Sequence, residues 1–318
     1  AGEGPLTEDL HGLRMDMGRP FDAERLEAGT FYGLFECEHR RDRLQRLVRV
    51  WTGRVARYIR DDDLVNAERL LNSVLENDPY PEQHAEAVGK AIERMATPEL
   101  LRLLADRDGD DKAAAAEALL AAFGLHAIDQ LVAQLAGEED GRVRRSLTNM
   151  VAGAARAKPQ TLDPYLSDHR WFLVRNLTTA LGRTGNPEAM GSIRQVLRHS
   201  DHRVRMEALR STVRLLRDEA TPVLIRGLSD PHEQVRHTAA TLVRGATGGD
   251  ADRMLADELR AGRLPPDMSI ELIVILGERR SPDGSLVLEE LASRRFAMRA
   301  HARAKRRAAR QALKGEAL

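Results

Sequence analysis

Residues 230–240 read Asp-Pro-His-Glu-Gln-Val-Arg-His-Thr-Ala-Ala, and this stretch decides the fold. An acid and a proline open a turn, a Val-Arg pair follows inside a helix, and small apolar residues continue at helical spacing. The same pair recurs after other acidic, turn-forming stretches, so that its arginine stands at Arg144, Arg175, Arg205 and Arg236. These arginines lie 31, 30 and 31 residues apart. A fixed period of this length is the signature of a repeat architecture.

Fainter copies of the pattern flank these four. On the N-terminal side, Asp110-Asp111-Lys112 leads into an alanine-rich helix. On the C-terminal side, residues 296–300 restart the pattern, and the interval before them has room for one degenerate unit at residues 266–277. Glycine and proline, which end and begin helices, cluster in the same phase at residues 182–187, 245–249 and 277–282. Each repeat is therefore predicted to form two antiparallel helices, and about seven repeats fit between residues 97 and 313.

The string at residues 230–240 resembles the HEAT repeat. The period and the Leu-Gly-x-x-Gly-Asn-Pro turn at residues 181–187 resemble its short bacterial subclass, named after phycobilisome lyases. The resemblance implies an all-α fold, a right-handed α-solenoid of about seven two-helix repeats. It specifies function only weakly, because such repeats serve many unrelated tasks.

Three segments differ in composition. Residues 1–36 are rich in glycine, proline and acid, and are interpreted as an arm or linker. Residues 37–96 contain three amphipathic helices, at 40–60, 64–76 and 81–95, which are expected to cap the N-terminal end of the solenoid because a terminal repeat otherwise exposes its core. Residues 97–318 are predicted to form the solenoid, ending in a basic helix.

The overall composition excludes several classes of protein. With 49 basic and 49 acidic residues, the net charge predicts no partner. The single cysteine, Cys37, rules out a disulfide framework or a multi-cysteine metal site and is expected to be a packed, inert thiol. No apolar run approaches the ~20 residues that cross a membrane, and no signal-like segment opens the chain, which favours a cytoplasmic protein. The scarcity of lysine beside arginine suggests a bacterial source.

Charge is distributed unevenly between the two helices of each unit. Residues 126–140 hold four acids and no base, whereas residues 141–157 hold four arginines and no acid, and residues 202–217 hold five arginines against Glu207 alone. Second helices line the concave face of HEAT solenoids, so a basic groove is expected there. The candidate contacts on that face are Arg145, Asn149, Arg170, Asn176, Arg203, Glu207, Arg210 and Arg214.

Two further sets of basic residues receive other interpretations. In HEAT-like repeats the Val-Arg arginine pairs with loop acids between neighbouring units, which predicts a structural ladder of Arg144, Arg175, Arg205, Asp230 and Arg236. The stretch 294–314 carries nine bases and no acid, more than capping a helix end requires. A basic patch for an acidic partner is therefore predicted at Arg303, Lys305, Arg306, Arg307 and Arg310.

No catalytic site is predicted. His232-Glu233 is similar to the pairs that hold di-iron in HEAT-repeat deoxyhypusine hydroxylases, but that family needs four such pairs and this sequence has one. Bilin lyases and HEAT-like DNA glycosylases have only the generic repeat and the Trp171-Phe172 pair in their favour. The chain is therefore expected to be a non-enzymatic scaffold without metal, cofactor or small-molecule substrate.

The expected partner is a protein, an acidic one being the natural match to an arginine-rich concave face. A nucleic-acid binder that uses the same groove and the basic C-terminal helix is the alternative. Aromatic residues, which stack on single-stranded bases, make up only 4% of the chain, and this favours protein.

Overall fold

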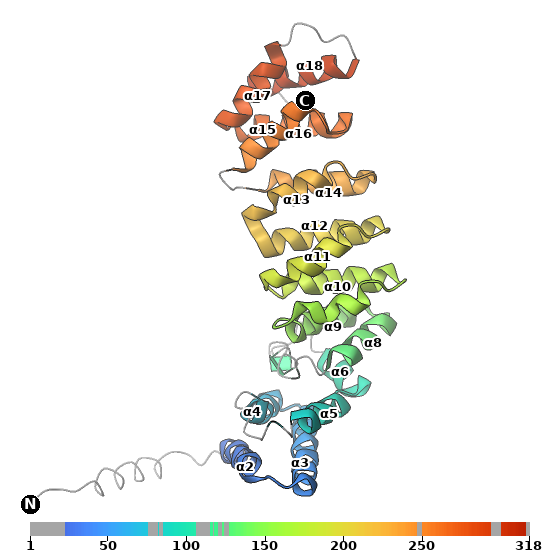
Figure 1. The fold of residues 1–318 in the computed structure, drawn as a ribbon, viewed down its shortest axis with the longest axis vertical. Coiled ribbons are helices and arrows are strands. Elements are labelled where there is room, and N and C mark those ends of the chain that lie inside the picture. The colour runs from blue at the N-terminus through green and yellow to red at the C-terminus, as the bar shows by residue number, and fades with distance from the viewer. Residues whose placement is uncertain are drawn as a thin grey trace, which may run out of the picture. The chain divides into compact units, whose positions relative to one another are not determined.

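The computed structural model describes residues 23–75, 82, 85–105, 115–116, 118–119, 123, 127–246, 250–293 and 300–315. Over these residues the chain consists of helices and short connections, with no strand (Figure 1). The prediction of an all-α fold is confirmed. Residues 1–22 of the predicted arm, most of the alanine-rich helix after Lys112 and the restart at residues 296–299 lie outside the described residues.

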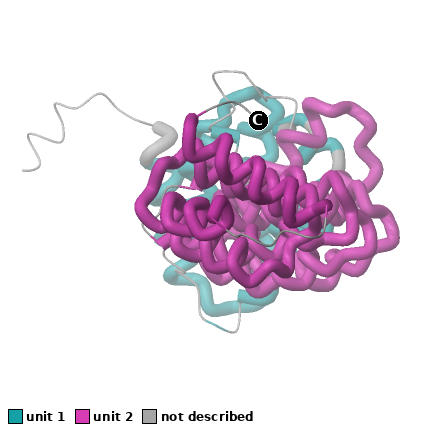
Figure 2. Tube along the Cα trace, turned by 90° about the horizontal axis from the view of Figure 1, so that it is seen from above, with its two compact units in different colours: residues 1–130 teal, residues 131–318 magenta. Residues whose placement is uncertain are grey.

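Contacts divide the chain into two compact units, unit 1 (residues 1–130) and unit 2 (residues 131–318), coloured separately in Figure 2. The composition of the sequence predicts the boundary at residue 96 instead. The first predicted repeat therefore falls in unit 1, and the following repeats fall in unit 2.

The described helices of unit 1 match the three amphipathic helices of the sequence and add one at each end. They are α2 (Ala23–Cys37), α3 (Arg41–Arg60), α4 (Leu64–Leu75), α5 (Ala85–Met95) and α6 (Pro98–Ala105). The α2 helix packs against α4 and α3, and α3 also contacts α5 and α6. Asp63 accepts a hydrogen bond from the Asn66 N–H at 3.3 Å, as expected of a carboxylate that precedes a helix.

Helix α2 corrects the interpretation of residues 1–36 as one arm. Phe35 is fully buried and meets the Trp51 ring edge-on, with ring centroids 5.5 Å apart. Glu27 accepts hydrogen bonds from Arg54 and from the Tyr58 hydroxyl, each at 2.6 Å. The buried contact between Phe35 and Trp51 and the partly exposed Arg54–Glu27 ion pair make α2 part of unit 1. An arm in solvent would leave the apolar side chain of Phe35 in contact with water. Cys37 ends the helix and is exposed, not packed.

Unit 2 is built from two rows of helices, one helix of each repeat in each row (Figure 1). The first helices, here the A row, are α8 (Ile128–Gly137), η3 (Pro159–Tyr165), η4 (Pro187–Ala189) with α11 (Met190–Val196), η5 (Arg217–Ala220) with α13 (Thr221–Gly227), α15 (Ala251–Ala261) and α17 (Pro282–Ser293). The second helices, here the B row, are α9 (Gly141–Ala154), α10 (Trp171–Arg183), α12 (His202–Leu216), α14 (Glu233–Arg244), α16 (Pro266–Arg279) and α18 (Ala300–Lys314). Each B helix contacts the next along the row.

The repeat motif produces this arrangement through its turn residues and its small side chains. Asp201 caps α12 by accepting a hydrogen bond from the Arg203 N–H at 2.8 Å. Gly182 allows α10 and α12 to approach closely, since a Cβ there would lie 2.5 Å from the Ser211 hydroxyl oxygen. The Val of each Val-Arg pair points into the core, and Val174, Val204 and Val235 are all buried. The described part of unit 2 thus contains six of the about seven predicted repeats.

Candidate functional site

The arginines of the Val-Arg pairs connect neighbouring repeats at two places. Arg205 on α12 donates to both carboxylate oxygens of Asp230, at 2.8 Å each, and both side chains are only 12% exposed. Its other terminal nitrogen donates to the carbonyl oxygens of His199 and Ser200. Arg236 on α14 also bonds an acid of the next repeat, but both of its bonds, at 3.3 and 3.0 Å, go to the single oxygen Oδ2 of Asp267. Arg236 does not bond the carboxylate of Asp230, the acid predicted for the same ladder, and reaches that residue through its carbonyl oxygen, at 3.1 Å.

Arg144 and Arg175, the other predicted ladder residues, form no ion pair with a described residue. The residue two positions after each loop aspartate explains why. Arg170 donates to both oxygens of Asp168 at 2.9 and 2.7 Å, and Arg203 donates to both oxygens of Asp201 at 3.1 and 2.7 Å. After Asp230 the corresponding residue is His232, whose side chain accepts the Gln234 N–H instead, so the Asp230 carboxylate is open to Arg205.

These ion pairs change the pKa values of the loop carboxylates. Hydrogen bonds from the Arg203 guanidinium, helped by the Arg203 backbone N–H, lower the pKa of Asp201 to about 2. Arg170 acts on Asp168 in the same way and holds its pKa well below its usual value. Burial raises the pKa of Asp230, but hydrogen bonds from Arg205 and the His232 N–H outweigh it, and the pKa is lowered.

Acid should therefore destabilise unit 2. A carboxyl group whose pKa is lower in the folded state contributes stability above its unfolded pKa of about 3.9, and that stability is lost as the pH falls through the folded value. We expect the melting temperature to fall as the pH is lowered from about 4 to about 2, the folded pKa of Asp201. Circular dichroism melts across this range measure it. The Asp168→Asn/Asp201→Asn variant should show a shallower fall, and an equal slope would contradict the assignment.

Arg170 and Arg203 were predicted to contact a partner, but each forms an ion pair with an aspartate of unit 2 itself. The Arg203 guanidinium carbon also lies 3.3 Å from the centroid of the Trp171 ring, so that this arginine joins α10 to α12 through a cation–π contact. A guanidinium group that already bonds a carboxylate and stacks on an aromatic ring has fewer N–H donors free for a partner.

Three of the predicted contacts on α12 form a cluster of two arginines around one buried carboxylate. Glu207 is only 4% exposed, and its carboxylate lies 2.8 Å from Arg214 and 3.5 Å from Arg210. Arg214 also donates to the Ser211 hydroxyl at 3.3 Å, and Ser211 donates to the Thr178 carbonyl on α10 at 2.9 Å. Part of the charge that the sequence assigned to a basic groove is therefore neutralised by the buried carboxylate.

The remaining predicted contacts lie on α9 and α10. Asn149 accepts a hydrogen bond from Arg183 of the next repeat. Asn176 is half-buried, and Arg145 is exposed and forms no ion pair with a described residue. Arg175, on α10, is exposed and unpaired in the same sense. The first two B helices of unit 2, α9 and α10, thus each carry an exposed arginine without an ion pair to a described residue, Arg145 and Arg175.

Helix α18 contains the predicted basic patch. Arg303, Arg307 and Arg310 lie at i, i+4 and i+7 of this helix, which places them on one face, and all three are exposed. Lys305 and Arg306 are half-buried. Burial and the charge of Lys305 lower the pKa of His301, which is consistent with a positive local potential.

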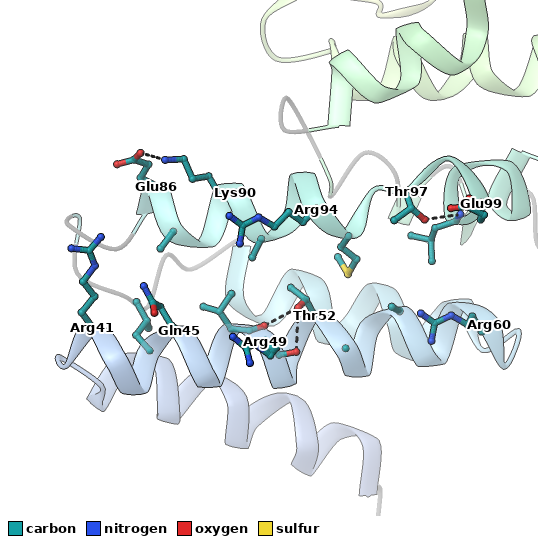
Figure 3. A pocket seen from close by; sticks show the side chains of 18 of the residues that line it. Arg41, Gln45, Arg49, Thr52, Arg60, Glu86, Lys90, Arg94, Thr97 and Glu99 are labelled. Atoms are coloured by element: carbon teal, nitrogen blue, oxygen red, sulfur yellow. Dashed lines mark hydrogen bonds and ion pairs between the residues drawn. The ribbon is translucent and has the colours of Figure 1, made fainter. Parts of the chain in front are cut away.

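A second basic surface lies in unit 1, where the sequence analysis predicted no site. A cleft of about 1400 Å³ runs between α3 on one side and α5 and α6 on the other (Figure 3). Five cationic side chains line it, namely Arg41, Arg49, Arg60, Lys90 and Arg94, against two carboxylates, Glu86 and Glu99.

The sequence carried a signal for this cleft. The lining residues of α3 recur at helical spacing, as do Glu86, Lys90 and Arg94 on α5, so each helix bears one polar stripe. An isolated polar stripe is normally solvated surface. Only the packing of α5 beside α3 turns the two stripes into facing walls.

Among the described residues, no group of three or more His, Cys, Asp or Glu side chains is placed to hold a metal ion. None of the described helices has the length and apolar character needed to cross a membrane.

Comparison with known proteins identifies the repeat. Residues 161–244, from η3 to the end of α14, match the family model of HEAT repeats, so this part of unit 2 is similar to HEAT repeats. No curated protein matches the sequence.

Among solved structures, the chain is similar to human deoxyhypusine hydroxylase in complex with glycerol, at 18% identity and a TM-score of 0.32, over 78% of this chain and 96% of that one. Two engineered proteins are similar at 14% and 16% identity, with TM-scores of 0.28 and 0.25, over 92% and 83% of this chain and 98% and 96% of theirs.

Proposed function

We propose that this chain is a non-catalytic scaffold that binds a protein partner along the exposed side of the B row of unit 2. The observation that carries the proposal is the unbroken contact of each B helix with the next. Six helices at 8–10 Å spacing present a surface on the order of 45 Å long. A surface of that length suits a macromolecule, whereas small ligands are held in enclosed pockets.

Two charged side chains of this surface, Arg183 and Arg244, are already held by neighbouring repeats. Arg183 bonds Asn149 of the preceding repeat, and Arg244 bonds Glu271 and Glu278 of the following one. Side chains already held in place lose less conformational freedom on binding, which favours affinity.

The partner is proposed to bind most strongly at α9 and α10. There Arg145 and Arg175 are exposed and form no ion pair with a described residue, while Arg210 and Arg214 of α12 share the carboxylate of Glu207. An acidic patch on the partner is the natural complement, since opposite charges fix the register of an interface.

Reversing these two charges tests the proposal. The Arg145→Glu/Arg175→Glu variant should lose at least about tenfold in affinity for the protein partner, because attraction becomes repulsion across the contact. Its free energy of unfolding should change by less than about 0.5 kcal/mol, since neither side chain is buried or paired. Affinity capture from a lysate of the source cells, followed by titration of the captured protein, measures the effect.

The matched control is Arg194→Glu/Arg226→Glu, which makes the same charge change on two exposed arginines of the A row that pair with no carboxylate in the described part of the chain. It should bind like the parent chain, and equal losses in both variants would overturn the proposal. Capture of nucleic acid instead, with affinity falling steeply in salt and depending on Arg303, Arg307 and Arg310, would establish the nucleic-acid alternative.

A further inference from the structure

We propose that the cleft between α3 and α5–α6 in unit 1 is a docking groove for an acidic, amphipathic segment of a protein. The site is independent of the B row, because every residue that lines it lies between His39 and Leu103. It therefore goes beyond the proposed function of unit 2.

The size of the cleft excludes a small ligand as its natural occupant. Its volume of about 1400 Å³ exceeds the ~300–1,000 Å³ of ordinary ligand pockets. It also follows α3 from Arg41 to Arg60, a helix that is about 28 Å long at 1.5 Å per residue. A helical segment of about five turns, or about eight extended residues, matches that length.

The floor of the cleft is apolar. Leu44, Val48 and Ala56 of α3 line it on one side and Met95 and Leu100 on the other, and each of these side chains is buried, with 8% or less exposed. Leu103 lines the same cleft and is 36% exposed, so one large apolar side chain is available for contact. An occupant needs an apolar face of its own to use this floor, which is how an amphipathic helix binds a groove.

The walls of the cleft are basic and mostly unpaired. Lys90 is paired with Glu86, and Lys90, with a smaller effect of Arg41, lowers the pKa of that carboxyl group. Arg49, Arg60 and Arg94 form no ion pair with a described residue. Figure 3 places Arg41, Arg49 and Arg60 along α3, with Lys90 and Arg94 across the cleft on α5. Cations on both rims of an apolar floor select an occupant that carries carboxylates on both sides of an apolar stripe.

The test uses the full chain and a fluorescent 18-residue peptide with leucines at i, i+3, i+4 and i+7 spacing and glutamates elsewhere. We expect saturable binding that weakens with salt. Arg49→Glu and Arg94→Glu should each weaken it at least about tenfold. The matched control is Arg43→Glu, which changes an exposed arginine of the same helix that lies outside the cleft and forms no ion pair with a described residue, and it should leave binding unchanged.

A neutral variant tests the groove without touching its charge. Gly53 lines the cleft, and a Cβ at this position meets nothing within 4 Å. Gly53→Leu should therefore fold normally, because leucine favours a helix more than glycine does, while its side chain occupies the groove and displaces the peptide.

Three results would overturn the proposal. They are no saturable binding by the parent chain, equal loss in Arg43→Glu, and unchanged binding in Gly53→Leu. Tighter binding of a 20-nucleotide oligothymidine than of the peptide, with the same dependence on Arg49 and Arg94, would also overturn it and identify a nucleic-acid groove. None of these results bears on Arg145 and Arg175, so the failure of one site is distinguishable from the failure of the other.

Discussion

Replacing Trp51 with alanine should destabilise unit 1 by about 4 kcal/mol, the middle of the range for removing a buried large aromatic side chain. The indole is fully buried, packs edge-on against Phe35, and donates its N–H to the Leu70 carbonyl at 3.0 Å. It therefore connects α2, α3 and α4 through a single side chain. Urea unfolding followed by circular dichroism measures the change.

Two further substitutions separate the contributions at Trp51. Trp51→Phe keeps most of the apolar volume but leaves the Leu70 carbonyl without this donor, and should cost about 2 kcal/mol. Val50→Ala, at an exposed position of the same helix, should be nearly neutral. Phe35→Ala should cost about 3 kcal/mol. An unchanged stability of Phe35→Ala would instead support the interpretation of α2 as part of an arm that does not pack on unit 1.

Replacing Arg205 with alanine should lower the stability of unit 2 by about 3 kcal/mol, because it leaves the largely buried Asp230 carboxylate without its partner. The substitution also removes the donor to the His199 and Ser200 carbonyl groups, which holds the turn before α12. Arg205→Lys should recover only part of the loss, since an ammonium group cannot bond both carboxylate oxygens in the fork geometry of arginine. Thermal and urea unfolding give the difference.

Arg175→Ala is the matched control for Arg205, because it removes the arginine at the same position of the preceding repeat. That side chain is exposed and unpaired, so the change should stay within about 0.5 kcal/mol. A double-mutant cycle with Asp230→Asn should return a coupling energy at Arg205 of at least about 1 kcal/mol. Equal effects at Arg175 and Arg205, or a coupling near zero, would show that the ladder does not hold the repeats together.

The sequence alone determined the fold class and the phase of the repeats. The recurrence of Val-Arg after acidic turns carries this information locally, because a turn, a capping carboxylate and an apolar stripe act within one or two helices. The predicted helix at 64–76 is α4, at Leu64–Leu75, and the predicted second helices of the repeats are the B row. The glycine and proline clusters also mark helix ends within the repeats.

Only the tertiary structure decided which charges are available. The sequence treated Arg170, Arg203, Arg210 and Arg214 as a basic surface, but each has a carboxylate partner at 3.5 Å or less. Asp201 is bonded by Arg203 through both of its carboxylate oxygens, a geometry that only the packed side chains determine. The basic cleft of unit 1 needs α5 to lie beside α3, which the polar stripes of the separate helices do not encode. Helices and their phase follow from neighbours in sequence, whereas the net charge of a surface follows from neighbours in space.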